Sequence, residues 1–449
     1  MFLHSRQSAV RGARLSAAQQ RDQMRRVIDA KSGRAGSLDY VCAWFLKAGA
    51  YLRNSKSRIG FVATNSVTQG EQVAQLWPLL FDRYGLEIAF AHRTFAWMSD
   101  AKGKAHVHCV IIGLTRRDDE PKEKRLFSYD DIKSDPHESR HTAVSPYLFD
   151  AGTLMNRHLV VRETRTPPPE APLLRMGCKI VDNGHYLFNS EERAVFLSKE
   201  PDADRYIRPF PGTEEFVNGV KRWVLYLGET EPSQLRRMPL VMDRIARVRA
   251  FREKSKKPKT RELAHAPTLF EVTTVPDGPF LALPEVSSER RDYVPIGWLM
   301  PPTIPSNKLL IFQTQDRYLF VLSSNMHMAW LRCIGGRLES RYQYSPGIVY
   351  NPFPWPQLDE AAKTTLEKLA KTVLDARAVH EGATLADLYD PDVMPEDLRK
   401  AHRALDEAVD KLYRQSRLAS RLPNIPCPSN GDIGLRVPKC YNSERRGDS

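Results

Sequence analysis

The sequence predicts an α/β protein built from several folding units. Up to about residue 115, amphipathic helical segments alternate with short apolar runs, a pattern typical of a sheet covered by helices. The middle of the chain is rich in proline and aromatic residues, which favours short elements. After residue 355, apolar residues recur every three or four positions at 359–380 and 395–414, and this spacing predicts two helices of a small bundle. Three units also agree with the length of 449 residues, at about 150 residues per domain.

The elements of the first region follow from their residue patterns. Asp39 falls in the first turn of an amphipathic helix, where the helix dipole favours a carboxylate. Gly85 has the place of a helix C-cap. The last two strands are separated by a polar loop at 97–104 and could pair antiparallel at the end of a parallel sheet. Helices are expected at 38–52 and 71–85, and strands at 58–67, 86–95 and 105–114.

Changes in composition divide the chain into five parts. A charge-dense stretch follows the first region, and the proline-rich middle follows that stretch. The last residues show no period and are predicted to be disordered. The expected parts are an α/β region at 1–115, a charged linker at 116–145, an α+β domain at 146–356, a helical C-terminal domain at 357–414 and a tail at 415–449.

The charge balance points to a polyanionic partner. There are 67 Lys and Arg against 54 Asp and Glu, which leaves a net charge of +13. Nine of the basic residues lie within 244–261. The six cysteines form no CxxC pair, and the longest apolar run, near 107–114, is far shorter than the roughly 18 residues of a membrane span. A cytoplasmic protein with reduced thiols and no membrane segment is therefore expected.

Standard catalytic motifs are missing. The sequence contains no G-x-S-x-G elbow, no P-loop and no H-E-x-x-H. His106 and His108 lie two apart on a predicted strand and could face one metal ion, but no third ligand has matching spacing. We interpret them as ordinary strand histidines and predict no metal site.

Several segments, in their order along the chain, resemble the MmeI-like family of class I S-adenosylmethionine-dependent DNA methyltransferases of restriction-modification systems. The resemblance runs from about residue 11 to about 414. It implies a partial Rossmann-like methyltransferase sheet, an α+β target-recognition domain and a C-terminal helical bundle. The segments that carry it are AGSLDYVCAWFLKAGAYL, RIGFVATNSVTQGEQVAQLW, IAFAHRTFAWMSDAKGKAHVHCVIIG, VSSERRDYVPIGWL, SSNMHMAWLRCIGGRLESRYQYS and VYNPFPWP.

Two motifs of that family are absent. Such enzymes bind the cofactor at a glycine-rich turn, and no G-x-G occurs in this chain. Their catalytic loop is Asn-Pro-Pro-Phe or Asn-Pro-Pro-Tyr, whose place before residue 11 is taken here by residues 4–10. Residues 351–354, Asn-Pro-Phe-Pro, belong to a later family segment and are assigned a structural role. The chain is accordingly expected to be an N-terminally truncated methyltransferase.

The resemblance suggests site residues in the remaining half of the methyltransferase domain. Asp39 and Asn65 would lie near the cofactor or the target base, although a helix-start carboxylate and a strand-end turn former explain them equally well. Phe95 or Trp97 matches the position of an aromatic wall that stacks on an extruded base. Packing in the core or against the following loop is the competing interpretation for these two rings.

The middle domain would read DNA. Arg and Gln side chains recognise base edges, and lysines neutralise phosphates. Two-residue spacing along one strand would place Arg337, Arg341 and Gln343 on a common face. The full set of expected DNA-binding residues is Arg290, Arg291, Arg337, Arg341, Gln343, Tyr344, Lys254, Lys256, Lys257 and Lys259.

The sequence therefore predicts a fragment of an adenine-specific DNA methyltransferase that binds double-stranded DNA but lacks the motifs for S-adenosylmethionine and catalysis. The alternative is a non-catalytic specificity subunit that works with a separate chain supplying the N-terminal methyltransferase half. A basic RNA-binding protein is a third possibility.

Overall fold

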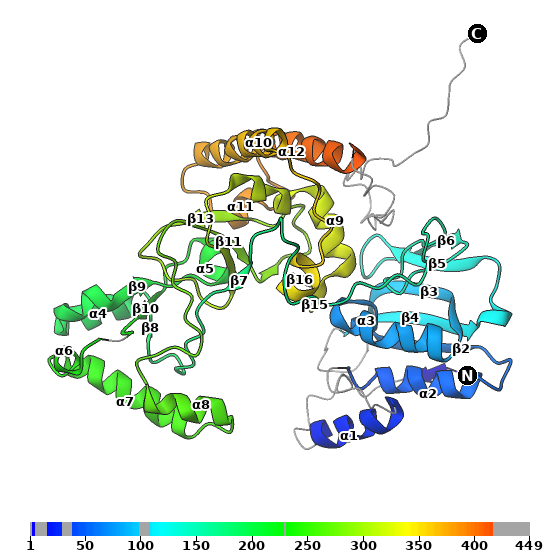
Figure 1. Ribbon diagram of the computed structural model, residues 1–449, viewed down its shortest axis with the longest axis horizontal. Helices are drawn as coiled ribbons and strands as arrows, with labels where there is room; N and C mark the ends of the chain where they lie inside the picture. The colour runs from blue at the N-terminus through cyan, green and yellow to red at the C-terminus, as the bar shows by residue number, and fades with distance from the viewer. Residues whose placement is uncertain (1, 5–15, 29–37, 98–106, 229, 416–449) are drawn as a thin grey trace, which may run out of the picture. The chain divides into compact units, whose positions relative to one another are not determined.

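The computed structural model describes residues 2–4, 16–28, 38–97, 107–228 and 230–415 (Figure 1). The chain forms two compact units. Unit 1 comprises residues 1–168, 325–358 and 409–449, and unit 2 comprises residues 169–324 and 359–408. The expected tail at 415–449 lies, beyond Gln415, outside the described residues. In the described part of the chain, no helix is long and apolar enough to cross a membrane.

Unit 1 is built on a six-stranded mixed sheet of order β1-β2-β4-β3-β5-β6. The pairs β1·β2 and β3·β5 are parallel, and the pairs β2·β4, β3·β4 and β5·β6 are antiparallel. The expected antiparallel pairing of the two later strands is confirmed, but they lie in the middle of the sheet and not at its end. The strands are β1 Phe2–His4, β2 Ile59–Thr64, β3 Leu86–Trp97, β4 Val107–Arg116, β5 Lys124–Tyr129 and β6 Pro136–His141.

The stretch 116–145, expected as a charged linker, is instead part of this sheet. After the short turn η4 (Arg117–Asp119), β5 and β6 form an antiparallel hairpin on its edge. Arg125 and Glu138, two of the charges that suggested a linker, lie on the exposed side of this hairpin and pair at 2.6 Å, whereas Lys124 is buried. Leu126, between them in sequence, is buried. The prediction was wrong because an edge hairpin needs only a few apolar residues, which a dense run of charges hides.

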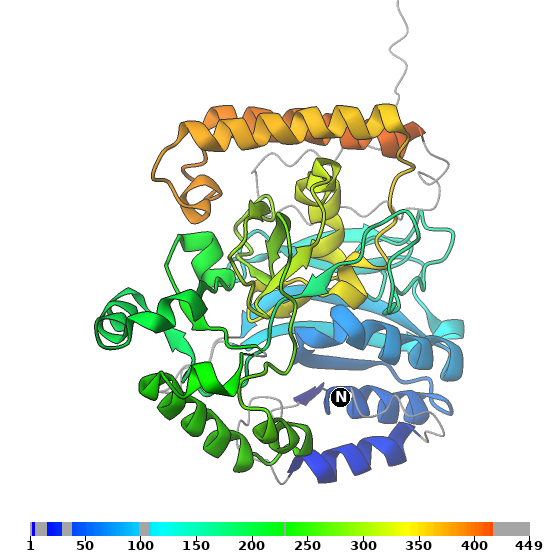
Figure 2. The same cartoon turned by 60° about the vertical axis from the view of Figure 1, so that its left-hand side comes forward.

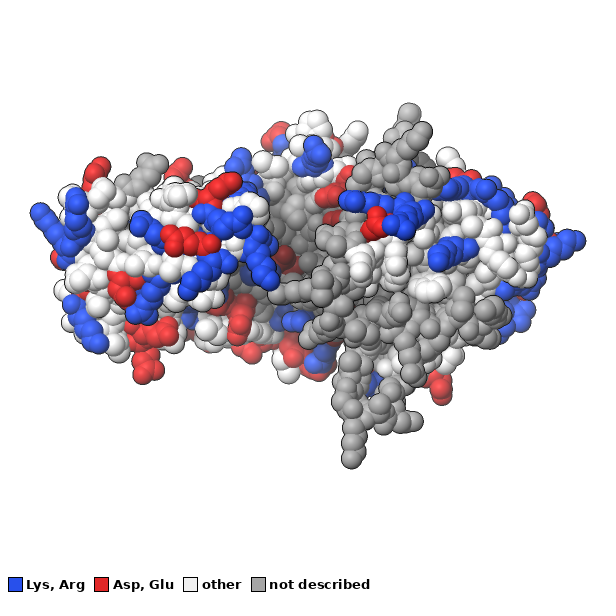
Figure 3. Space-filling model, turned by 90° about the horizontal axis from the view of Figure 1, so that it is seen from below, with Lys and Arg blue, Asp and Glu red and all other residues white. Residues whose placement is uncertain are grey.

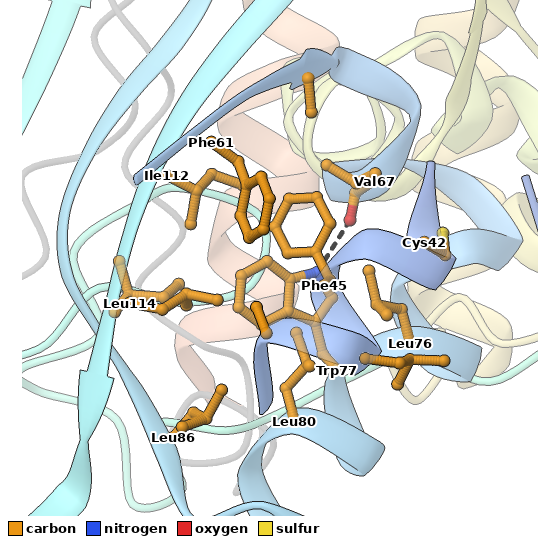
Figure 4. Packing of buried hydrophobic residues seen from close by; sticks show 14 of the residues in the cluster. Cys42, Phe45, Phe61, Val67, Leu76, Trp77, Leu80, Leu86, Ile112 and Leu114 are labelled. Atoms are coloured by element: carbon orange, nitrogen blue, oxygen red, sulfur yellow. Dashed lines mark hydrogen bonds between the residues drawn. The ribbon is translucent and has the colours of Figure 1, made fainter. Parts of the chain in front are cut away.

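Helices cover one face of the sheet. Trp77 is fully buried there and donates a hydrogen bond from Nε1 to the carbonyl oxygen of Val67 at 2.8 Å, while the rings of Phe45 and Phe61 lie 4.6 Å apart (Figure 4). Gly85, with φ of +62°, ends the helical segment as expected. The elements are α1 Ser16–Ile28, α2 Cys42–Leu52, η2 Asn65–Thr68, α3 Gly70–Pro78 and the π-helical turn η3 Leu79–Arg83.

A second part of unit 1 comes from residues 325–358, although the sequence placed them in the middle domain. They form α9 Asn325–Ile334, the hairpin of β15 Gly336–Leu338 and β16 Arg341–Gln343, and the turn η8 Pro346–Tyr350. A side chain at Gly70, at the start of α3, would place its Cβ 3.4 Å from the Cα of Gly336. Gly70 also has a φ of +56°, a left-handed conformation that favours glycine at this position.

Unit 2 contains two small sheets, of order β8-β10-β9 and β13-β11-β14-β7, with short helices between their strands. The long α10 and α12 lie side by side, as both ribbon views show (Figures 1 and 2). They agree closely with the helical segments expected at 359–380 and 395–414. The elements are β7 Arg175–Met176, β8 Leu187–Phe188, α4 Ser190–Lys199, η5 Pro201–Tyr206, β9 Ile207–Pro209, α5 Thr213–Asn218, β10 Trp223–Leu225, α6 Pro232–Leu235, α7 Pro239–Glu253, α8 Pro258–Glu262, η6 Leu263–His265, β11 Phe280–Pro284, β12 Val286–Ser287, β13 Gly297–Leu299, β14 Leu309–Phe312, η7 Arg317–Ser323, α10 Glu360–Val379, α11 Leu385–Leu388 and α12 Glu396–Gln415.

Candidate functional site

Five aromatic rings gather at one end of the unit 1 sheet. Phe95 stacks on Tyr129 with 5.5 Å between ring centroids, and Trp97 lies 6.2 Å from Phe95. His92 stacks on Phe127 at 4.1 Å with an interplanar angle of 7°. Trp97 keeps 36% of its surface exposed and the other four rings are half-buried. We call His92, Phe95, Trp97, Phe127 and Tyr129 the edge cluster.

Strand register explains why these rings share a face. His92 pairs with Ile111 on β4 and Phe95 pairs with Cys109, so three steps along β3 match two steps along β4. This irregularity is a bulge, which turns Phe95 to the same side as His92 although their spacing is odd. On the other side of β3, His92 pairs directly with Phe127 of β5. The bulge and the parallel β3·β5 pairing therefore assemble the cluster.

Polar contacts fix the inner rings of the edge cluster. The hydroxyl of Tyr129 and Nδ1 of His92 are 2.8 Å apart and share a hydrogen bond. Burial lowers the pKa of His92, and the nearby Arg125 guanidinium lowers it further. Arg125 itself lies over the Phe127 ring, 4.9 Å from its centroid. His92 is therefore neutral near pH 7, and it packs as an aromatic ring held by a hydrogen bond.

Asn65 lies at the same end of the sheet as Phe95. It follows β2 directly, and the last residue of β2, Thr64, pairs with Cys109, which in turn pairs with Phe95. The backbone carbonyl of Asn65 accepts a hydrogen bond from Thr68 Oγ1 at 2.9 Å. This contact supports a turn-forming role and leaves the half-buried amide side chain directed by no described hydrogen bond.

Asp39 precedes α2 and does not lie within it. Its carbonyl accepts a hydrogen bond from the amide of Cys42 at 3.0 Å, and its own amide donates to Gln72 Oε1 at 2.9 Å. Asp39 was expected in the first turn of the helix, but it lies about one turn before the first residue of α2. Asp39 is exposed and joins the starts of α2 and α3.

The two arginines expected to read DNA at 290 and 291 make contacts inside unit 2. The Arg290 guanidinium pairs with Asp392, and Asp390 is 3.7 Å away. Burial lowers the pKa of the half-buried Arg291. The negative charge of Asp390 acts in the opposite direction and raises that pKa, but by less. Both side chains therefore have structural neighbours inside unit 2, and Arg291 is half-buried.

The segment around 337–344 is a hairpin and not one continuous strand, so the expected common face does not form. Glu339 sits in the turn with φ of +60°, and Arg337 pairs across the hairpin with Tyr342. The Arg337 guanidinium lies 3.9 Å from the Tyr342 ring centroid, on the face opposite to the exposed Arg341 and Gln343. The single-strand prediction was wrong because the turn reverses the alternation after Leu338.

The expected role of Tyr344 as a DNA contact also needs correction. Its side chain is buried, and its hydroxyl lies 2.7 Å from Nε2 of the fully buried His327. Burial raises the pKa of Tyr344 well above its usual value. The ring therefore belongs to the core of unit 1. Alternation alone could not distinguish this buried tyrosine from an exposed one.

The basic stretch 244–261 divides into buried and exposed cations. Arg252 is completely buried, and burial lowers its pKa. The Arg244 guanidinium lies 4.0 Å from the centroid of the Phe188 ring. Arg252 donates to six backbone carbonyl oxygens, those of Ile180, Val181, Leu263, Ala266, Pro267 and Leu269, at 2.8–3.3 Å. Arg244 and Arg252, two of the nine basic residues, thus make contacts that stabilise unit 2.

The four expected lysines follow α7 and are exposed. Lys259 lies 4.0 Å from Glu271, a carboxylate that also pairs with Lys179 at 2.8 Å. Over this region, Lys and Arg are numerous on the surface, with Asp and Glu among them (Figure 3). The remaining residues of the set, Lys254, Lys256 and Lys257, are exposed as well.

Sequence reasoning missed three members of the edge cluster. Phe127 and Tyr129 lie two apart in KRLFSY, the spacing of a strand face, but the surrounding charges obscured this signal. His92 was visible in the strand at 86–95, although nothing in the pattern indicated the bulge that aligns it with Phe95. His106 lies outside the described residues, and among those described no three His, Cys, Asp or Glu residues are grouped to hold a metal ion.

Known proteins show the family to which this chain belongs. Models of the MmeI DNA-methyltransferase domain, target recognition domain and C-terminal domain match residues 9–128, 155–357 and 358–422. The chain belongs to the MmeI family, and the resemblance expected from the sequence is confirmed, as is the mixed α/β fold class.

Two relatives are informative. DNA methyltransferase A of Bacillus subtilis (strain 168) is 37% identical over 384 residues, which are 85% of this chain and 42% of the relative. The structure of the Type IIL restriction-modification enzyme MmeI in complex with DNA matches with a TM-score of 0.84 and 40% identity over 90% of this chain and 53% of MmeI. The chain thus spans about half the length of each relative.

Proposed function

We propose that this chain is a DNA-recognising part of an adenine-specific DNA methyltransferase of a restriction-modification system, and that it acts on double-stranded DNA in the cytoplasm. The observation that carries the proposal is the order of three MmeI domains along the chain, together with 40% identity to an MmeI structure solved with DNA. A likeness of this extent supports a shared mode of DNA binding.

The edge cluster is proposed to receive the extruded target base. Removing a base from the duplex costs a few kcal/mol, and stacking on aromatic rings returns about 1–3 kcal/mol per base. Phe95 and Trp97 offer half-exposed and exposed rings, backed by Tyr129.

S-adenosylmethionine is the methyl donor that the family implies. The residues proposed near it, Asp39 and Asn65, do not form a binding site by themselves, because Asp39 is exposed and neither side chain is oriented by a described hydrogen bond. The sequence also lacks the glycine-rich turn and the Asn-Pro-Pro loop. We infer that the polypeptide described here does not methylate DNA alone, and that a chain carrying those motifs completes the enzyme.

DNA contacts are assigned to the basic and amide side chains that the fold leaves exposed. Arg341 and Gln343 lie on the outer face of the β15·β16 hairpin, where they can read base edges. Arg341 pairs with Glu339 at 2.8 Å, and both side chains are exposed. Such a surface ion pair is weak, so Arg341 can leave Glu339 and bind a guanine at little cost in free energy. Lys254, Lys256 and Lys257 are assigned to phosphates.

Selection from a pool of random duplexes tests this function. The purified chain is expected to enrich a defined sequence, with and without S-adenosylmethionine, and to incorporate no labelled methyl group on its own. The double variant Arg341→Ala with Gln343→Ala should lose the enrichment at some positions of that sequence while keeping its overall affinity within about tenfold. Enrichment no better than a random pool, or a preference for RNA, would overturn the proposal.

A further inference from the structure

A polar hollow opens on the surface of unit 2. None of the residues that line it belongs to the DNA-binding set named above. Its volume is about 400 Å³. It lies between the turn η5 and the segment that joins α6 to α7. Its lining residues are Pro201, Asp202, Arg205, Gln234, Arg237 and Met238.

The two guanidinium groups in this hollow have no acidic partner. Among the described residues, no carboxylate oxygen lies within 4.0 Å of Arg205 or Arg237. Neighbouring arginines behave differently, since Arg193 pairs with Asp204 at 2.6 Å and Arg247 pairs with Asp243 at 2.6 Å. Arg205 lies over the Tyr206 ring, 4.9 Å from its centroid, which holds the guanidinium without neutralising it.

The remaining polar groups favour an anion in the hollow. The Oε1 atom of Gln234 accepts a hydrogen bond from the Tyr206 hydroxyl at 2.9 Å, so the amide nitrogen is the free donor. The buried carboxylate of Glu200 is occupied by the amides of Leu240 and Val241, each at 2.8 Å. Asp202 contributes one negative charge against two guanidinium groups, so the lining keeps a net positive charge.

We propose that Arg205, Arg237 and Gln234 bind a backbone phosphate of duplex DNA. The guanidinium fork matches the oxygen atoms of a phosphodiester, and a hollow open to the surface suits a phosphate presented on a long strand. Such a contact carries no sequence information and fixes the position of unit 2 on the duplex. This inference rests on the proposed DNA recognition and adds a phosphate site outside the lysine segment 254–259.

The salt dependence of DNA binding tests the site. Fluorescence anisotropy with one fixed duplex at several salt concentrations compares the wild-type chain with the double variant Arg205→Gln, Arg237→Gln. Loss of one phosphate contact lowers the slope of log affinity against log salt by about 0.9. Affinity at low salt is expected to fall by about tenfold. The variant Arg205→Lys, Arg237→Lys should recover part of the slope, because charge is kept while the fork is lost.

A matched control separates a specific site from a general loss of charge. Lys400 and Lys411 of α12 are exposed, and no described carboxylate pairs with either. The variant Lys400→Gln, Lys411→Gln removes two positive charges, as the arginine variant does. Its slope of log affinity against log salt should stay within about 0.3 of the wild-type slope. Equal slopes for the arginine variant and this control would overturn the phosphate site alone. Failure of the wild-type chain to bind duplex DNA would overturn the proposed function, and this site with it.

Discussion

Unit 1 contains two aromatic clusters of similar composition and opposite environment. The edge cluster leaves Trp97 36% exposed. A second group, which we call the buried cluster, consists of His327, Trp330, Tyr344, Phe353 and Trp355, and each of its side chains is at most 6% exposed. Each cluster contains a histidine bonded to a tyrosine hydroxyl, at 2.8 Å in the edge cluster and 2.7 Å in the buried one.

The difference lies in how completely the rings are enclosed. Phe353 meets His327 edge-on at 4.4 Å and Trp355 edge-on at 5.5 Å, and Trp330 Nε1 donates to the carbonyl of Val349 at 2.8 Å. In the edge cluster, Trp97 lies 6.2 Å from Phe95 and keeps 36% of its surface exposed. Aromatic content alone therefore does not reveal a binding surface. The exposed fraction of the rings is what separates the two clusters.

Truncation in the buried cluster should give the largest loss of stability. Phe353→Ala removes a ring enclosed by His327, Trp330 and Trp355, and we expect the free energy of unfolding to fall by about 3–5 kcal/mol. Chemical denaturation checks the value. Leu338→Ala serves as the control, because Leu338 is 46% exposed and its truncation should cost less than about 1 kcal/mol. Equal losses would mean that the buried cluster is not a packed core.

The histidines of the two clusters should differ in their response to pH. Complete burial lowers the pKa of His327 to about 3, whereas an unfolded histidine has a pKa of about 6.5. The unfolded chain therefore takes up a proton first. The stability that comes from the neutral buried ring is fully present above about pH 6.5 and is lost as the pH falls toward about 3.

Denaturation at several pH values measures this effect. Between pH 6 and pH 4, the free energy of unfolding of the wild-type chain should fall more steeply than that of His327→Gln, by up to about 1.4 kcal/mol per pH unit. His92→Gln should change the slope less, because His92 is only half-buried. Parallel curves for wild type and His327→Gln would contradict the assignment of a neutral buried histidine.

The sequence could predict much of the fold, and the two clusters explain where it could not. Helical spacing predicted α10 and α12 closely, and short apolar runs predicted the strands β2, β3 and β4, because regular burial leaves a pattern in the sequence. The pattern did not distinguish Tyr344 from Gln343, since a polar alternating segment is compatible with either face being buried. It also missed Phe127 and Tyr129, whose neighbours are charged.

Contacts between distant residues were out of reach of local patterns. Asn351 was interpreted as structural, and its Nδ2 donates to the carbonyl of Thr164 at 2.8 Å, a contact across 187 positions. Family resemblance supplied Phe95 and Trp97, but only the bulge in β3 shows that His92 joins them. Likewise, charge counting could not tell that Arg252 is buried among carbonyl oxygens while the following lysines face solvent.

Truncation in the edge cluster should have the smallest effect on stability and a clear effect on DNA. Phe95→Ala removes a half-buried ring, so the free energy of unfolding should fall by only about 1 kcal/mol. If Phe95 stacks on the extruded base, the variant should also reduce the fluorescence change of 2-aminopurine placed at the target adenine. This change is measured with the enzyme completed by the chain that carries the cofactor and catalytic motifs.

Two variants serve as controls. Tyr51→Ala, at a residue that is 64% exposed on α2, should leave both quantities near wild type. Tyr129→Phe keeps the ring that stacks on Phe95 and loses only the bond to His92, so it should lie between the two. A wild-type fluorescence change in Phe95→Ala, with stability lowered as in Phe353→Ala, would show that Phe95 is an ordinary core residue and that both clusters serve only packing.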